Sequence, residues 1–288
     1  MKTLADFDTK KIKLIAFDLD GTLLDPASHV TAETKEALEK AAAAGYSLAA
    51  ATGRVYTSLP KDLFEIEGLR YVITSNGAHV VDLKTGETLY SRLIDPACLQ
   101  AALPVIFSRD LLVEIFYQHR GYFDQHCLDD LAFYGVDTPA RREYTRTTRT
   151  AVPDIRSLLE EHKAELENVM IMFADPAVKQ EYFDALKDLP GLNVVYSSHL
   201  SLEIGGSEST KANALAFLQQ KLGLEPDSLM AFGDSTNDLS MLEYAYMGIA
   251  MGNSVQYLKD RADLIGPTNA ENGVALMIRT LMALNGEL

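Results

Sequence analysis

The sequence is poor in the features that would tie the chain to a disulfide framework or a membrane. It has two cysteines, Cys98 and Cys127, which are too few for a set of disulfides and have no zinc-binding spacing. No stretch approaches the roughly 18 consecutive apolar residues of a membrane-spanning helix. The start of the chain, up to Lys13, is polar and has no apolar signal-peptide core. We therefore expect a soluble, cytoplasmic protein with free thiols.

Positive charge is also scarce. Lysine and arginine number 26 against 41 aspartates and glutamates, so the formal net charge is −15. Nucleic acids and anionic membrane surfaces would be repelled, which makes both poor partners. A small anionic substrate stays compatible if a cation or local hydrogen-bond donors lie in the site. The 47% of hydrophobic residues excludes disorder as the main state, and a length of 288 residues predicts about two domains.

The N-terminal part alternates short apolar runs with helical patterns. Thr31 is typical of a helix N-cap, and Gly45 of a helix stop. An order of strand, helix, strand, helix, strand predicts a parallel sheet with right-handed crossovers. The expected strands are Lys13–Asp18, Tyr46–Ala51 and Tyr71–Thr74, and the expected helices are Thr31–Ala44 and Val55–Phe64.

After Asn76-Gly77 the pattern changes to a hairpin signature, with strands at 78–82 and 88–91. Up to about Gly206, helical stretches such as 155–167 and 177–189 mix with short strands. The first rhythm returns from Lys211. We expect an α/β fold: a Rossmann-like three-layer core with a parallel sheet, formed by residues 1–82 and 207–288, and an inserted α+β domain formed by 83–206.

The stretch from Ile15 to Leu24 carries the most chemical information. Asp18 and Asp20 lie where the first strand ends, and ligands of open α/β sheets bind beyond the carboxyl ends of the strands. Two carboxylates this close repel each other, which favours a hard divalent cation between them. A plain strand-end turn through Asp20-Gly21 is the structural alternative.

Three further stretches follow the same logic. Thr52 and Gly53 come after the second strand, where a hydroxyl and a helix-start amide can bind phosphate oxygens. Lys211 begins a helix directly after the insertion. A later strand is followed by the run from Gly233 to Asp238, with Asp234 and Asp238 four residues apart. Each residue alone fits a cap or a solvated position, but their shared place at strand ends of one predicted sheet favours a site.

In this order, the four stretches resemble the core motifs of the haloacid dehalogenase superfamily of phosphohydrolases. The resemblance is to its Cof-like branch, which has a large α/β (class IIB) cap inserted after the third core strand. The stretches at 75–78 and 250–254 match as well, so the similarity covers nearly the whole chain. The cap is matched by its placement, size and mixed pattern.

The resemblance implies a role for each carboxylate. Asp18 would be the nucleophile that forms an aspartyl-phosphate, and Asp20 the general acid/base that protonates the leaving group and activates water. Mg²⁺ would be held by the Asp18 carboxylate, the Asp20 backbone carbonyl and Asp234, with Asp238 assisting directly or through water.

The phosphoryl group would be held by Thr52, Gly53 and Lys211, and Asn237 would contact the substrate or orient its loop. The acid at position 20 favours phosphatases or phosphomutases over dehalogenases. Two positions depart from the pattern: Ala212 stands where relatives usually have glycine, and Ser235 where many have asparagine.

The inserted segment offers weaker clues to the substrate. Four arginines lie within Arg141–Arg149, and they are either a solvated run or a surface that attracts a second anionic group of the substrate. His119 and His126 lie near Asp124, but their spacing does not match hydrolytic zinc motifs, which favours surface or packing roles.

Together these features predict a Mg²⁺-dependent phosphatase of small soluble phosphomonoesters. Sugar phosphates come first, followed by nucleotide, flavin-precursor and pyridoxal phosphates. One alternative is a phosphomutase or phosphotransferase on the same fold, such as a phosphomannomutase-like enzyme, and another is a non-catalytic phosphosugar-binding regulator. The expected partner is a small phosphorylated metabolite, with no nucleic acid or membrane, and the expected state is a monomer or weak homo-oligomer.

Overall fold

The computed structural model describes residues 3–288, apart from the side chain of Ser197. These residues fall into two compact units. Unit 1 contains the residues up to Thr52, Leu59–Tyr90 and Thr210–Leu288. Unit 2 contains Gly53–Ser58 and Ser91–Ser209. Unit 1 is therefore discontinuous in sequence, and most of unit 2 is one inserted segment.

Unit 1 is built on an eight-stranded sheet with the order β14-β13-β12-β1-β2-β3-β4-β5. The strands from β14 to β3 run parallel, and β4 is antiparallel to β3. The central strands are short apolar runs buried on both faces, as expected of a parallel sheet. The strands are β1 (Leu14–Phe17), β2 (Ser47–Ala51), β3 (Leu69–Thr74), β4 (His79–Asp82), β5 (Glu87–Ser91), β12 (Leu229–Gly233), β13 (Met247–Ala250) and β14 (Leu264–Ile265).

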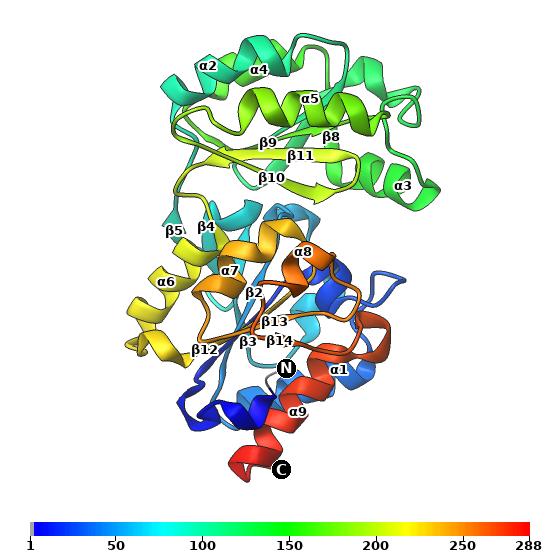
Figure 1. Cartoon of the computed structure of the whole chain (residues 1–288). Coiled ribbons are helices and arrows are strands. Elements are labelled where there is room, and N and C mark those ends of the chain that lie inside the picture. The colour runs from blue at the N-terminus through cyan, green and yellow to red at the C-terminus, as the bar shows by residue number, and fades with distance from the viewer. Residues whose placement is uncertain (1–2) are drawn as a thin grey trace. The chain divides into compact units, whose positions relative to one another are not determined.

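Helices cover both faces of this sheet (Figure 1). Leu14 and Ala16 of β1 share one buried cluster with Leu215 and Leu218 of α6. Helices α1 and α9 pack against each other, and Arg279 of α9 pairs with Glu33 of α1 at 2.6 Å. The predicted Rossmann-like three-layer core is confirmed. The helices are α1 (Ala32–Ala43), α6 (Lys211–Leu222), α7 (Leu239–Tyr244), α8 (Gln256–Lys259) and α9 (Gly273–Asn285).

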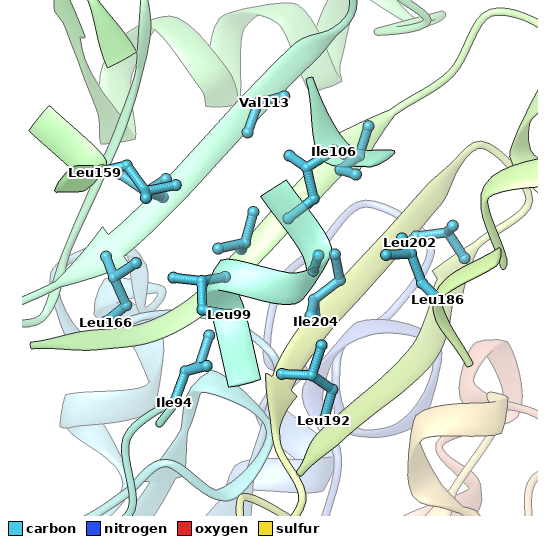
Figure 2. Close-up of a cluster of buried hydrophobic side chains, with 14 of the residues drawn as sticks. Ile94, Leu99, Ile106, Val113, Leu159, Leu166, Leu186, Leu192, Leu202 and Ile204 are labelled. Atoms are coloured by element: carbon cyan, nitrogen blue, oxygen red, sulfur yellow. The ribbon is translucent and has the colours of Figure 1, made fainter. Parts of the chain in front are cut away.

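Unit 2 has its own six-stranded sheet, with the order β10-β11-β9-β6-β7-β8. The helices Pro96–Ile106, Ile155–His162 and Pro176–Leu186 pack on one face over a large apolar cluster, part of which Figure 2 shows. No helix formed by residues 3–288 has the length and apolar character needed to cross a membrane. The elements are α2 (Pro96–Ile106), β6 (Leu112–Tyr117), β7 (Arg120–Asp124), α3 (Pro139–Thr148), β8 (Arg149–Val152), α4 (Ile155–His162), β9 (Leu166–Met172), α5 (Pro176–Leu186), β10 (Leu192–Ser198) and β11 (Ser201–Gly206).

The two units divide at positions that differ from the predicted ones at 82 and 206. Strand β5 joins β4 in the sheet of unit 1, so unit 1 continues to Tyr90. On the return, unit 1 begins again at Thr210, the N-cap of α6. The hairpin explains the first difference. Its strands β4 and β5 both belong to the unit 1 sheet, so the boundary falls at the end of β5 and not between the two strands.

Two predicted helices are wrong in extent. The segment 55–64 forms two short 3₁₀ turns, Tyr56–Ser58 and Lys61–Glu65, because Pro60 between them has no amide to donate and disfavours helix at the residue before it. The helix predicted over 155–167 ends at His162, and β9 begins at Leu166. Glu167, predicted on a helix, is therefore a fully buried strand residue.

A buried ion pair lies on the sheet of unit 2. Arg149 of β8 donates from Nε to Oε2 of Glu114 of β6 at 2.6 Å, and the two side chains are only 6% and 2% exposed. The guanidinium also lies 4.9 Å from the ring centroid of Phe116. Removing one partner of such a pair leaves the other charge buried without its counter-ion, which is strongly destabilising.

We predict that Arg149→Ala lowers the free energy of unfolding by about 3–5 kcal/mol, because Glu114 loses its counter-ion. Arg141→Ala is the control, since Arg141 pairs with Asp137 on the surface at 3.5 Å. That change should cost less than about 1 kcal/mol. Urea unfolding of both variants measures the difference, and equal losses would contradict the prediction.

Candidate active site

The carboxyl ends of three neighbouring strands bring predicted residues to one edge of the unit 1 sheet. Asp18 follows β1, Thr52 follows β2 and Asp234 follows β12. The register pairs Phe17 with both Ala50 and Phe232, so the three strands end at about the same level. This edge is where open α/β sheets bind ligands.

The turn after β1 lies directly against Asp234. Gly21 has a φ of +81°, and a Cβ built on it would lie 2.5 Å from Oδ2 of Asp234. Thr22, the next residue, donates from Oγ1 to Oδ1 of Asp234 at 3.1 Å. Asn253 donates from Nδ2 to the Gly21 carbonyl at 2.7 Å and ties the turn to the loop after β13. Glycine is therefore required here by both conformation and space.

Asp238 holds the loop after β12 in place. Its Oδ2 accepts hydrogen bonds from the backbone amides of Asp234 and Ser235, each at 3.0 Å. Its Oδ1 accepts from Lys211 Nζ at 2.6 Å. One fully buried carboxylate thus fixes both the loop that carries Asp234 and the ammonium of Lys211.

Lys211 is the only lysine among the fully buried large side chains of residues 3–288. Its Nζ lies 2.7 Å from Oδ1 of Asp18 and 2.6 Å from Oδ1 of Asp238, so it bridges the ends of β1 and β12. Thr210 caps α6 by accepting the Asn213 amide at 3.1 Å. Gly77 has a φ of +109° and a built Cβ would lie 2.2 Å from the Thr210 carbonyl oxygen. That close approach fixes where α6, and hence Lys211, begins.

The electrostatics of the cluster are dominated by burial and like charge. Burial raises the pKa of Asp18 well above its usual value, Asp238 and Asp234 raise it further, and Lys211 opposes the change. Burial and then Asp238 raise the pKa of Asp234 to about 7. Burial alone would lower the pKa of Lys211, but attraction by Asp18 and Asp238 raises it instead. Three carboxylates around one ammonium leave an excess of negative charge.

This donor set fits a divalent cation. Carboxylate oxygens of Asp18, Asp234 and Asp238 all lie within 4.8 Å of one another. Oxygen-only ligands suit a hard ion such as Mg²⁺, and a bound cation would offset the repulsion that raises the pKa of Asp234. Both oxygens of Asp238 already accept hydrogen bonds, which leaves Asp18 and Asp234 as the carboxylates with more capacity for a metal.

The remaining predicted residues are placed as follows. Asp20 is exposed in the turn after β1, and its charge contributes to the raised pKa of Asp234. Thr52 is buried, and its amide donates to the Ile73 carbonyl at 2.8 Å. Gly53 begins the short stretch that belongs to unit 2. Asn237 donates from Nδ2 to Oδ1 of Asn76 at 3.1 Å.

Sequence reasoning did not assign site roles to Thr22, Asn76 or Asn253. Asn76 links Asn237 and Thr52. Its side-chain oxygen accepts the hydrogen bond from Asn237, and its backbone amide donates to the Thr52 carbonyl at 3.0 Å. Ser75 and Asn76 both have positive φ, at 50° and 56°, and such strained backbone often marks functional positions. The Asn-Gly pair after a buried strand was the available signal.

Three of the four arginines of the run and the two histidines have partners inside unit 2. Arg142 donates to the backbone carbonyls of Val136 and Asp137, each at 2.9 Å. Arg149 pairs with Glu114, as described above. His126 lies between Asp110 and Asp124, at 2.9 and 2.7 Å. The backbone amide of His119 donates to Oε1 of Glu167 at 2.6 Å.

Comparisons with known proteins agree with this geometry. The family described as haloacid dehalogenase-like hydrolase matches residues 15–278. Phosphatase YwpJ of Bacillus subtilis (strain 168) is 30% identical over 94% of this chain and 100% of its own length. The 5-amino-6-(5-phospho-D-ribitylamino)uracil phosphatase YwtE of the same organism is also 30% identical, over 94% of this chain and 99% of its own length.

The same fold is found among solved structures. A haloacid dehalogenase-like hydrolase from B. subtilis superposes with a TM-score of 0.82 at 28% identity, covering 93% of this chain and 99% of that one. The ordered strand-end residues, the three-layer core with its inserted unit, and these matches over nearly the whole chain agree with one another. The chain belongs to the haloacid dehalogenase-like hydrolase family, in its Cof-like branch.

Proposed function

We propose that the protein is a Mg²⁺-dependent phosphatase that hydrolyses small soluble phosphomonoesters through an aspartyl-phosphate on Asp18. The observation that carries the proposal is the buried contact of Asp18 with Lys211 at 2.7 Å, beside the carboxylates of Asp234 and Asp238. YwpJ and YwtE, which are both named as phosphatases, support the reaction class. The proposal also gives roles to Asp20, Thr52, Gly53 and Asn237, which lie in the loops that follow β1, β2 and β12.

In this proposal an oxygen of Asp18 attacks the phosphorus, and the ester oxygen leaves. Lys211 fixes the attacking carboxylate through Oδ1 and offsets negative charge as it develops. The raised pKa of Lys211 keeps the ammonium protonated at neutral pH. A bound Mg²⁺ would supply further charge neutralisation for the carboxylates and the phosphate oxygens.

Asp20 is the proton donor to the leaving oxygen, and then the base that takes a proton from the water that attacks the aspartyl-phosphate. Its exposed position suits this role, because a general acid must reach a group outside the buried cluster. Thr52, Gly53 and Asn237 bind phosphate oxygens or hold the loops that do so. The contact of Asn237 with Asn76, whose amide bonds to Thr52, links these loops.

The proposal gives the two units different roles. Unit 1 carries the reacting residues, and unit 2 is the cap that selects the leaving group and excludes water. YwtE, whose name specifies a phosphoribityl substrate, supports hydroxylated phosphomonoesters as substrates, with sugar phosphates first. Nucleotide, flavin-precursor and pyridoxal phosphates complete the panel to be tested.

The first test replaces the nucleophile. We predict that Asp18→Asn lowers kcat for phosphate release by about 10³-fold or more, because the amide cannot form the covalent intermediate. The measurement is inorganic phosphate released from a panel of phosphomonoesters with Mg²⁺. Asp227→Asn is the control, since Asp227 is an exposed partner of Lys11. Equal activity of wild type and Asp18→Asn, or no activity on any ester, would rule out the proposal.

The second test removes the metal. We predict that a chelator abolishes hydrolysis, that added Mg²⁺ restores it, and that Mg²⁺ raises the melting temperature of the wild type by binding the folded state. Asp234→Asn should lose most of this thermal shift, and Asp227→Asn should keep it. Full activity after exhaustive chelation would show that the cluster does not need a metal.

The third test uses the space around Gly21. We predict that Gly21→Ala lowers kcat/KM about 100-fold and weakens the Mg²⁺-induced thermal shift, because the new methyl would press on the Asp234 carboxylate. Gly45→Ala is a matched control: Gly45 also has a positive φ, +98°, but a Cβ there has nothing within 4 Å. In both variants, backbone strain lowers the free energy of unfolding by about 1 kcal/mol. A comparable loss of activity in both would mean that strain, and not contact with Asp234, explains the effect.

A further inference from the structure

The turn after β1, which carries Asp20, is closed at both ends by its own backbone. Asp20 and Gly21 lie between two hydrogen bonds, and Gly21 has a φ of +81°. A glycine adopts several backbone conformations at similar energy, so the peptide group after it needs a further contact to keep one orientation. The two bonds run from the Leu23 amide to the Asp18 carbonyl at 3.2 Å and from the Leu24 amide to the Leu19 carbonyl at 2.9 Å.

The side chain of Asn253 makes such a contact from the loop after β13. Its Nδ2 donates to the Gly21 carbonyl at 2.7 Å, and its Oδ1 accepts from the backbone amide of Asn269 at 3.0 Å. Asn269 in turn donates from Nδ2 to the Leu24 carbonyl at 2.8 Å. A side-chain amide suits this place because it offers a donor and an acceptor at once. The two asparagines therefore bond to each other and to two points of one turn.

The loop that carries Asn253 is itself anchored to the end of β12. Ser254 is buried, and its Oγ donates to the Gly233 carbonyl at 3.1 Å. The backbone amide of Val255 donates to the Asp234 carbonyl at 3.2 Å. All of these residues belong to unit 1. Asn253 thus extends to the Gly21 turn from a support that is fixed on the neighbouring strand.

We propose that Asn253 is a positioning residue for Asp20, and that its bond to the Gly21 carbonyl holds the turn so that the Asp20 carboxyl reaches the ester oxygen. This inference rests on the proposed function, in which Asp20 gives a proton to that oxygen. Asn253 acts through the turn and not through contact with the substrate. Proton transfer needs hydrogen-bond contact between the acid and the leaving oxygen, so a small displacement of the turn slows ester cleavage.

The test uses two aryl esters that differ in their need for an acid. Phenolate is a basic leaving group and departs slowly without a proton, whereas p-nitrophenolate is a weak base and departs readily without one. Loss of the acid therefore lowers kcat/KM more for phenyl phosphate than for p-nitrophenyl phosphate. The ratio kcat/KM is used because it covers the steps up to departure of the leaving group and excludes hydrolysis of the aspartyl-phosphate. Asp20→Asn, which removes the acid itself, sets the full size of the difference.

We expect Asn253→Ala to lower kcat/KM about tenfold or more for phenyl phosphate, and less than about threefold for p-nitrophenyl phosphate. Asn253 is exposed, so the variant should fold, and its melting temperature checks this. Asn269→Ala should show the same difference at a smaller size, because Asn269 bonds to the turn at Leu24, farther from Asp20. The rise in melting temperature on adding Mg²⁺ should persist in both variants.

Asn285→Ala is the matched control within unit 1. Asn285 also donates from Nδ2 to a backbone carbonyl, that of Thr9 at 3.3 Å. Thr9 precedes β1, so this bond lies at the amino ends of the strands and not at the edge that carries the site. The control should change kcat/KM for either ester by less than about twofold.

The outcomes separate the inference from the proposed function. If Asp20→Asn shows the difference between the esters and Asn253→Ala lowers both equally, or neither, the inference is overturned and the proposed function stands. Loss of the Mg²⁺-induced thermal shift in Asn253→Ala would also overturn it, because the residue would then support the metal site. If Asp20→Asn lowers both esters equally, the acid role of Asp20 fails and the inference fails with it.

A second pair of substrates covers a wild type that does not accept aryl esters. Acetyl phosphate, whose leaving group is a weak base, then replaces p-nitrophenyl phosphate, and the best alkyl ester of the panel replaces phenyl phosphate. We expect the same difference, with the larger loss for the alkyl ester. Inactivity of the wild type on every ester would rule out the proposed function and, with it, the inference.

Discussion

The site depends on one electrostatic constraint. A lysine ammonium that is buried away from solvent must be paired with carboxylates, because an unpaired buried charge is costly. Lys211 meets Asp18 and Asp238 at 2.7 and 2.6 Å. Because these residues come from α6, from the end of β1 and from the loop after β12, the ion cluster fixes three segments that are far apart in sequence. Two glycines allow these segments to come close enough. Gly21 lies against the Asp234 carboxylate, and Gly77 lies against Thr210 at the start of α6.

The cluster also explains how an acidic protein accepts an anionic substrate. Its carboxylates outnumber its one ammonium, and the pKa of Asp234, raised to about 7 first by burial and then by Asp238, reflects that imbalance. A divalent cation bound between these carboxylates would offset the imbalance and attract phosphate oxygens. The net charge of −15 therefore says little about the ligand, because a few carboxylates at one sheet edge set the local field.

The unit 2 sheet applies a different principle. One face carries the larger apolar core, and the other carries a smaller apolar cluster together with the buried side chains of Glu114, Asn168 and Glu203. Arg149 and Glu114 form a buried ion pair. Nothing in the sequence of the four-arginine run distinguishes Arg149, whose side chain is buried, from the other three arginines. Asn168 donates from Nδ2 to Oε2 of Glu203 at 2.7 Å, and the register between β9 and β11 brings these two residues together although they are 35 positions apart in the chain.

The sequence by itself determined the three-layer core and the order of the strand-end residues, because apolar runs buried on both faces and their polar ends are local patterns. It predicted Asp18, Asp234, Asp238 and Lys211 as neighbours. Pro60 was a local signal against the helix expected at 55–64. Tertiary structure decided the rest. The end of the helix expected at 155–167 was decided by the tertiary structure, which buries Glu167 in β9. The pairing of Lys211 with Asp238, and of Asn168 with Glu203, depends on packing and register, which no local pattern encodes.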